Sequence, residues 1–155
     1  MGYTYGTDLY QWGTDPAKGD YWRKALSLPS SGQMTHLRDF LAKLEWWRLL
    51  PAPELIQKPS TEYLHRSVLA RTARGDLAVA YLPDQEGVDI DLSGFVAPVT
   101  TEWFDPTNGK FTGTNEKPLL NQGGHRFTPP GKNSDGDGDW ALVLTAGLDK
   151  SGVKQ

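Results

Sequence analysis

The 155-residue chain contains no cysteine, and this absence excludes disulfide bonds, thiolate zinc sites and a cysteine nucleophile. It has no apolar run approaching the roughly 20 residues of a membrane-spanning helix, and residues 1–10 have neither the basic nor the apolar region of a signal peptide. The formal charge is −3 and no basic run could follow a phosphate backbone. We therefore expect neither a membrane nor a nucleic acid as partner.

Aromatic residues are abundant: the chain has six Trp, six Tyr and five Phe. Because each can bury a large area, they favour a folded protein over a disordered one. The 17 Gly and 11 Pro indicate many turns. At this length the chain has room for one ordinary domain, or for a domain of about 90 residues with a structured extension.

The clearest helical pattern begins after Ser30 or Ser31, either of which could cap it, and Pro51 and Pro53 stop it. Apolar residues at spacings of three and four form a stripe: Met34, Leu37, Phe40, Leu41, Leu44 and Trp47. We expect this stripe to cover a neighbouring sheet, or to pair with a second copy of the chain in a homodimer.

From Ser60 onward the apolar residues alternate with a period of two, which is typical of strands. Turn signals such as Arg74-Gly75, Pro83-Asp84 and Gly123-Gly124 separate the segments. The expected strands are 67–73, 76–82, 88–92, 99–104, 110–112, 125–128 and 140–145. About seven short strands with no helix between them predict a mainly β fold, an antiparallel β-sandwich.

An ordered series of aromatic and polar segments runs through most of the chain. The first group is Tyr3-Thr4-Tyr5-Gly6, Tyr10-Gln11-Trp12, Trp22-Arg23-Lys24-Ala25-Leu26, Gln33-Met34-Thr35-His36-Leu37-Arg38 and Trp46-Trp47-Arg48-Leu49-Leu50-Pro51. The second is Val79-Ala80-Tyr81-Leu82-Pro83, Trp103-Phe104-Asp105-Pro106-Thr107-Asn108-Gly109 and Asp139-Trp140-Ala141-Leu142-Val143-Leu144. The first group resembles the last strand and helix of the (β/α)8 barrel of apiosidase-like glycoside hydrolases. The second is similar to the β-domain that follows that barrel, known as a collagen-binding domain of a collagenase.

This resemblance implies three regions. Residues 1–57 would be the C-terminal strand, loop and helix of the barrel, residues 58–148 the accessory β-sandwich, and residues 149–155 a tail. The two carboxylates that hydrolyse a glycoside would lie upstream of residue 1, so the resemblance supplies no catalytic residue. One strand and one helix cannot close a barrel, which needs all eight strands.

Aromatic side chains near the N-terminus are the candidate substrate-binding residues. Tyr5, Tyr10 and Trp12 lie where the eighth strand would meet its loop, the face on which barrel active sites are built. Departures from the resembled family occur here, because Tyr10 replaces its usual Trp and the loop between Gly6 and Tyr10 lacks its His-Asn pair. The other tryptophans are better explained as core or domain-junction residues: Trp46, Trp47, Trp103 and Trp140.

A calcium-like pattern lies between the last two expected strands. Asn133, Asp135, Asp137 and Asp139 offer oxygen ligands at alternate positions, with Gly138 sixth, but Leu144 stands where the bidentate acid is expected. The alternative is a polar hairpin turn. Calcium is the single cofactor that the sequence suggests.

Serine, histidine and aspartate can be combined into a catalytic trio on paper, for example Ser67, His65 and Asp89. No Gly-x-Ser-x-Gly elbow supports it, so solvent-facing or capping histidines are the better interpretation. The acids from Glu86 to Asp91 alternate with Val88 and Ile90, which is typical of the wet face of an antiparallel sheet.

The leading functional hypothesis is a non-catalytic C-terminal fragment of a glycoside-hydrolase-like protein. It would brace the catalytic barrel or assist binding to a carbohydrate polymer or a matrix protein. One alternative is a small stand-alone hydrolase, a glycosidase or esterase, with an acid- or histidine-based site. Another is a carbohydrate-binding module that uses Tyr10 and Trp12. The sequence leaves the compartment open; an exported parent would carry its signal upstream.

Overall fold

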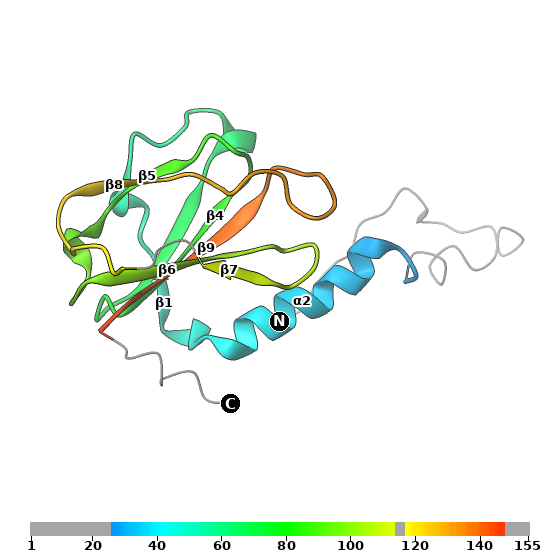
Figure 1. Ribbon diagram of the computed structural model, residues 1–155, viewed down its shortest axis with the longest axis horizontal. Coiled ribbons are helices and arrows are strands. Elements are labelled where there is room, and N and C mark those ends of the chain that lie inside the picture. The colour runs from blue at the N-terminus through cyan, green and yellow to red at the C-terminus, as the bar shows by residue number, and fades with distance from the viewer. Residues whose placement is uncertain (1–25, 114–116, 148–155) are drawn as a thin grey trace, which may run out of the picture.

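The computed structural model describes residues 26–113 and 117–147, and it confirms the antiparallel β-sandwich (Figure 1). The larger sheet has the order β1–β3–β4–β9–β6–β7 and the smaller one β2–β5–β8, with every pairing antiparallel. The expected strand in residues 1–10, the residues Tyr5, Tyr10 and Trp12, and the tail 149–155 lie outside the described residues.

Each of the seven expected strand segments corresponds to an observed strand. They are β3 (Val68–Thr72), β4 (Leu77–Leu82), β5 (Val88–Asp91), β6 (Val99–Phe104), β7 (Phe111–Gly113), β8 (Gly124–Phe127) and β9 (Trp140–Ala146). Two short strands were not predicted: β1 (Leu49–Pro51) at one edge of the larger sheet and β2 (Ile56–Gln57) at one edge of the smaller sheet.

The main core lies between the two sheets. Ala78, Ala80 and Leu82 face it from β4, and Ile90 faces it from β5. The same core contains Trp103 and Trp140 as predicted, with their ring centroids 6.4 Å apart in an edge-to-face arrangement. The two sheets are therefore joined by a continuous set of buried apolar side chains.

A second, smaller core lies on the opposite face of the larger sheet, where helix α2 (Pro29–Lys43) covers it (Figure 1). Phe40 is the buried residue of α2, and its ring centroid lies 4.3 Å from that of Phe104. Leu41 and Leu44 pack against the same cluster. Of the two alternatives for the apolar stripe, the structure shows the first, in which the helix covers a sheet.

The helix differs from the prediction at both ends. It begins at Pro29, a first-turn position where the missing N–H of proline costs no hydrogen bond, so Ser30 and Ser31 do not cap it. It ends at Lys43, well before Pro51, because the chain turns through the 3-10 helix η2 (Trp46–Arg48) and then pairs β1 with β3. No helix of residues 26–113 and 117–147 is long and apolar enough to cross a membrane.

Candidate functional site

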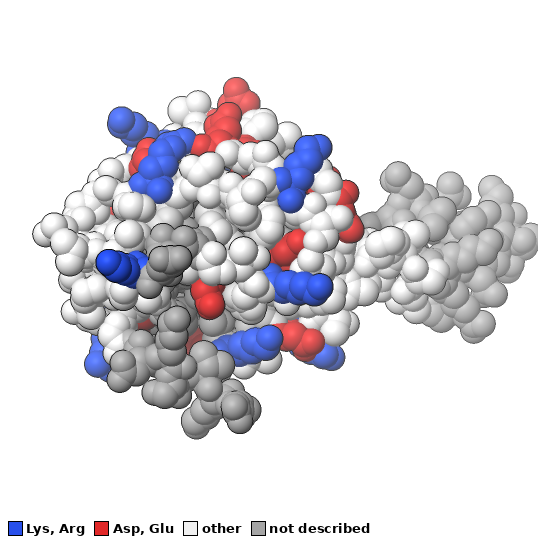
Figure 2. Space-filling view, viewed as in Figure 1, with Lys and Arg blue, Asp and Glu red and all other residues white. Residues whose placement is uncertain are grey.

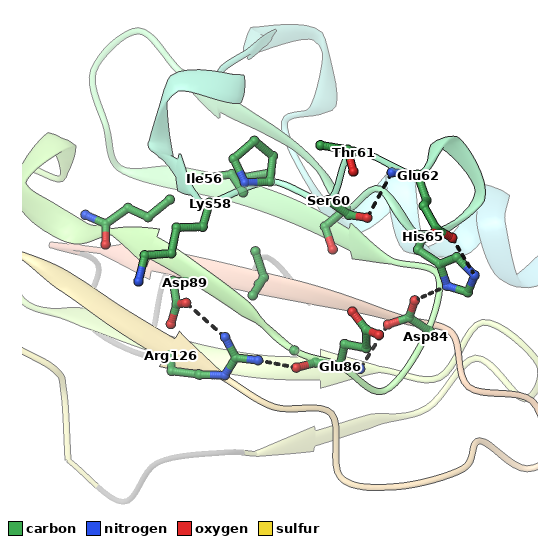
Figure 3. Close-up of a pocket in the computed structure, with 15 residues that line it drawn as sticks. Ile56, Lys58, Ser60, Thr61, Glu62, His65, Asp84, Glu86, Asp89 and Arg126 are labelled. Atoms are coloured by element: carbon green, nitrogen blue, oxygen red, sulfur yellow. Dashed lines mark hydrogen bonds and ion pairs between the residues drawn. The ribbon is translucent and has the colours of Figure 1, made fainter.

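A polar groove of about 480 Å³ opens beside the smaller sheet (Figure 3). One wall is the segment that follows β2 and includes the 3-10 helix η4 (Tyr63–His65). The other wall is the β4–β5 turn, and the floor includes Asp89 of β5 and Arg126 of β8. The sandwich thus brings together residues that are far apart in the sequence.

At one end of the groove His65 is bonded to Asp84. The histidine Nδ1 and the aspartate Oδ2 are 2.7 Å apart, and His65 Nε2 lies 3.8 Å from an Oε2 atom of Glu62. The hydrogen bond to Asp84 is the main reason that the pKa of His65 is raised. Asp84 also accepts a 2.9 Å bond from the backbone N–H of Glu86, so both partners are fixed in place.

At the other end Arg126 is paired with Asp89. Strand pairing sets these residues opposite each other, and Arg126 Nη1 lies 2.9 Å from Asp89 Oδ2. The same guanidinium donates a hydrogen bond to the carbonyl oxygen of Glu86. Lys58 extends into this end of the groove (Figure 3) and has no ion-pair partner within the described part of the chain.

The trio considered from the sequence does not form a catalytic relay. Ser67, His65 and Asp89 all line the groove, but His65 bonds to Asp84 and Asp89 bonds to Arg126. No hydrogen bond joins Ser67 to His65 among residues 26–113 and 117–147. The acids of β5 behave as expected, because Asp89 is part-exposed while Val88 and Ile90 are buried.

The segment considered as a calcium loop forms a hydrogen-bonded polar turn. Asn133 Oδ1 accepts bonds from the backbone N–H groups of Asp135 and Asp137, at 3.1 and 2.9 Å. Asn133 Nδ2 donates to Asp139 Oδ1 at 2.8 Å. In the described ranges no group of three or more His, Cys, Asp or Glu could hold a metal ion. Calcium binding stays a prediction.

Two carboxylates of this turn connect it to other elements. Asp135 accepts a 2.7 Å bond from Gln33 of α2, and Asp139 accepts a 3.1 Å bond from the hydroxyl of Tyr81. Burial, followed by the charge of Asp139, raises the pKa of Tyr81 to about 12. These contacts give the turn a structural role in positioning the helix against the sandwich.

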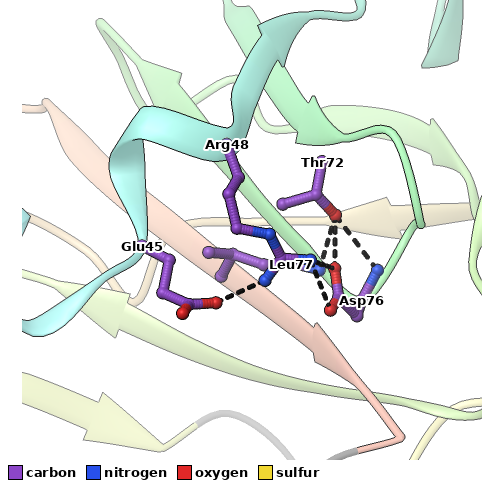
Figure 4. Close-up of polar contacts among 5 residues, drawn as sticks. All are labelled: Glu45, Arg48, Thr72, Asp76 and Leu77. Carbon is purple, nitrogen blue, oxygen red and sulfur yellow. Dashed lines mark hydrogen bonds and ion pairs between the residues drawn. The ribbon is translucent and has the colours of Figure 1, made fainter.

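A clamp around Arg48 fixes η2 to the turn between β3 and β4 (Figure 4). Arg48 Nη2 lies 2.9 and 2.8 Å from the two carboxylate oxygens of Asp76, and Nη1 donates to Glu45. Thr72 donates a further bond to Asp76. Burial alone would raise the pKa of Asp76, but the bonds from Thr72 and Arg48 outweigh it and hold the pKa below its usual value.

Beside this clamp large apolar side chains face the solvent. Trp46, Trp47 and Leu50 are 48%, 65% and 56% exposed, and we call these three residues the junction surface. The core position considered for the two tryptophans is therefore wrong for the described residues, whereas a role at a domain junction stays a prediction. Both residues lie in η2, after α2 has ended at Lys43, and their rings contact each other edge to face with centroids 6.3 Å apart.

Sequence reasoning did not single out Lys58, Asp84 or Arg126 as site residues. The turn signal at Pro83-Asp84 was the one available hint. Arg126 could not be assigned because strand pairing brings it to a residue 37 positions away. The positive backbone φ of Lys58, +55°, also has no signature in residue type.

Comparison with known proteins agrees with this architecture. Residues 50–145, more than half of the chain, match the family described as "Putative collagen-binding domain of a collagenase". No curated protein matches the sequence.

Two solved structures share the fold. One is named as a glycoside hydrolase (TM-score 0.71, 21% identity, 91% of this chain and 31% of that chain). The other is a glycoside hydrolase of family 5 from Bacteroides vulgatus (TM-score 0.72, 21% identity, 94% of this chain and 30% of that chain). The chain thus spans less than a third of each protein. The chain, whose matched residues form the strands of the sandwich from β1 to β9, belongs to the family described as "Putative collagen-binding domain of a collagenase".

Proposed function

We propose that this chain is a non-catalytic accessory domain that braces the barrel of a glycoside hydrolase. The observation that carries the proposal is the junction surface, Trp46, Trp47 and Leu50, which is apolar, exposed and held in place by Arg48. Large exposed apolar side chains gathered within residues 46–50 favour a contact with another domain or protein. The solved glycoside hydrolases support the identity of that partner, because this fold makes up about a third of each.

Rigidity supports a bracing role. Arg48 bonds η2 to Asp76, which is only 8% exposed. Phe40 packs α2 against the outer face of the larger sheet. The tryptophans are therefore carried by an element attached at two places. Covering each large aromatic ring stabilises a contact by about 25 cal/mol per Å² of apolar area removed from water.

The first test concerns catalysis by the isolated chain. The groove contains carboxylates and a histidine, so the rival hypothesis of a small hydrolase predicts turnover that depends on them. We expect the purified 155-residue protein to release no product above buffer from a panel of aryl glycosides and aryl esters. Turnover that disappears in both His65→Ala and Glu86→Gln, with folding intact by circular dichroism, would contradict the proposal.

The second test concerns the contact with a barrel. In the glycoside hydrolase that carries this domain, Trp46→Ala with Trp47→Ala should lower the melting temperature of the whole protein. The same pair in the isolated 155-residue chain should change it little, because both side chains are already exposed there. Tyr63→Ala, which removes a side chain that is 85% exposed, is the matched control. Equal effects of the tryptophan pair in both proteins would argue against the junction.

A further inference from the structure

The groove contains polar groups that the fold itself does not use. Lys58 and Thr61 on one wall, and the carboxylate of Glu86 on the other, make no hydrogen bond or ion pair within the described part of the chain. Together they offer donors and acceptors within one cavity. Unused polar groups that converge on a concave surface are what a ligand site requires.

The surrounding framework is fixed before any ligand arrives. His65–Asp84 holds one end and Arg126–Asp89 holds the other, and Ser60 Oγ accepts a 3.2 Å bond from the backbone N–H of Glu62. A groove that is already ordered loses less conformational entropy on binding than a mobile loop does.

Lys58 adds an observation of a different kind. Its φ of +55° is a left-handed conformation that costs a non-glycine residue about 1 kcal/mol or more, and it is the one such residue in the described ranges. Backbone strain of this sort concentrates at functional sites. Here the strained residue is also the cation that extends into the groove without a partner (Figure 3).

An exposed aromatic residue lies next to the groove residues in the sequence. Tyr63 is 85% exposed and belongs to η4 between Glu62 and His65, both of which line the groove. The ion pair of His65 with Asp84 anchors this short helix. An exposed phenol ring on a short helix that borders a polar groove offers an apolar face close to hydrogen-bonding groups.

The charges of the groove select the ligand class. Its four carboxylates disfavour phosphates, sulfates and other anions, while the two strong cations disfavour a polycation. The four acids are Glu62, Asp84, Glu86 and Asp89, and the cations are Lys58 and Arg126. Figure 2 likewise shows positive and negative side chains interspersed over the visible face. A neutral molecule with many hydroxyl groups can use the donors and the acceptors at once.

We propose that this groove binds a neutral oligosaccharide, with Tyr63 stacking on one sugar ring and Lys58 and Glu86 bonding to hydroxyl groups. The choice of a saccharide rests on the proposed association with a glycoside hydrolase. The volume of about 480 Å³ lies within the usual range of small-ligand sites, about 300–1,000 Å³. The groove lies on the side of β5 and β8, and α2 lies across the sandwich from it (Figure 1), so saccharide and barrel can be held together.

The test is an NMR titration of the ¹⁵N-labelled 155-residue protein with soluble neutral gluco-, xylo-, manno- and galacto-oligosaccharides. At least one series should give saturable shifts that centre on Lys58, Tyr63 and Glu86. Tyr63→Ala and Glu86→Gln should each weaken binding about tenfold, which corresponds to about 1.4 kcal/mol. Trp47→Ala, which alters an exposed ring of the junction surface, should leave the affinity unchanged.

Three results of the saccharide titrations would overturn this site. They are the absence of saturable shifts with every series, shifts that centre away from the groove, and full affinity in both groove variants with their spectra otherwise native. A triple-helical collagen peptide forms a second arm, and saturable binding of that peptide in the groove without any saccharide binding would also overturn the proposal. Failure here leaves the junction test intact, because that test measures Trp46 and Trp47 in the barrel-containing protein.

Discussion

At the scale of single residues, Asp84 governs the protonation of His65. The 2.7 Å bond between Nδ1 and Oδ2 is the largest cause of the raised pKa of His65. We therefore expect Asp84→Asn to lower that pKa, measured by NMR titration of the imidazole ring. Folding raises this pKa, so the ion pair contributes its full stability below pH 6.5, the ordinary pKa of histidine. That contribution is lost as the pH rises through the folded pKa.

A matched variant sharpens this prediction. Glu86 affects the pKa of His65 through its charge alone, and its effect on that pKa is the smallest among the causes of the shift. Glu86→Gln should therefore lower the pKa of His65 less than Asp84→Asn does. Equal decreases in the two variants would show that the direct bond is not the main cause.

Two glycines with similar backbone φ angles distinguish the cost of backbone strain from the cost of a steric contact. Gly109 has a φ of +73° and Gly123 a φ of +63°. A Cβ at Gly109 would lie 2.7 Å from Nδ1 of His36, whereas one at Gly123 would have nothing within 4 Å. We expect Gly123→Ala to cost about 1–2 kcal/mol and Gly109→Ala to cost more, measured by urea unfolding.

The role of His36 can be checked in the same series. His36→Ala should recover part of the loss in Gly109→Ala, because it removes the group that the new methyl group meets. If the two glycine variants lose the same stability, backbone strain alone explains both, and the contact of the β6–β7 turn with α2 contributes nothing.

At the scale of elements, Phe40 attaches α2 to the larger sheet. It is 5% exposed and its ring contacts Phe104 and Phe111. Phe40→Ala should lower the free energy of unfolding by about 3–5 kcal/mol, because it leaves a cavity in the second core. Leu37→Ala, on the same helix but 41% exposed, should cost much less. Similar losses in guanidinium unfolding would contradict this packing.

Two aspartates link separate elements, and both predict acid sensitivity. Asp76 holds η2 and Asp105 bonds to Thr107 and Ser134. Burial would raise the pKa of each carboxyl, but the bonds they accept leave both below the ordinary value of 3.8. As the pH falls, these two carboxyls bind protons at a higher pH in the unfolded chain than in the folded protein. The free energy of unfolding therefore decreases below about pH 3.8 and keeps decreasing as the pH falls through the folded pKa values.

The variants Asp76→Asn and Asp105→Asn should each flatten this dependence, measured as the free energy of urea unfolding between neutral and strongly acidic pH. Glu102→Gln removes an exposed carboxylate from β6 and serves as the control. A slope that is unchanged in both aspartate variants would show that other groups cause the acid sensitivity.

The elements also show what could be read from the sequence. Alternation together with the flanking turn signals identified β3 to β9; on β5, for example, Val88 and Ile90 are buried while Asp89 is part-exposed. The strands β1 and β2 have three and two residues and lie in the stretch around Pro51 and Pro53 that directly follows the helical pattern, so neither alternation nor a turn signal marks them. The end of α2 was predicted too far along the chain, because the apolar spacing does not show that the chain pairs with β3 from Leu49 onward.

The groove was less accessible to sequence reasoning than the strands. Its charged pairs form across strand partners and turns, so their members carry no common motif. His65 was interpreted as a solvent-facing or capping residue, and the structure adds the bond to Asp84 that fixes it. Sequence patterns predict helices and strands because each is formed by consecutive residues. This site instead depends on strand register and on the placement of loops, which involve residues far apart in the sequence.

At the scale of the whole molecule, both cores share the strands β4 and β9. Leu142 and Leu144 of β9 face the core between the sheets, while Val143 faces the core under α2. The two cores should therefore unfold together. We expect far-ultraviolet and near-ultraviolet circular dichroism to give coincident urea transitions. Separate midpoints would show that the helix and its core form an independent unit.

The order of strands has a further consequence for the behaviour of the molecule at high concentration. The larger sheet ends at β1, which has three residues and contains Pro51, and at β7, which also has three residues. Proline cannot donate a ladder hydrogen bond, and short borders offer few unpaired backbone groups to an incoming chain. Both borders of the larger sheet are thus poor templates for fibril growth.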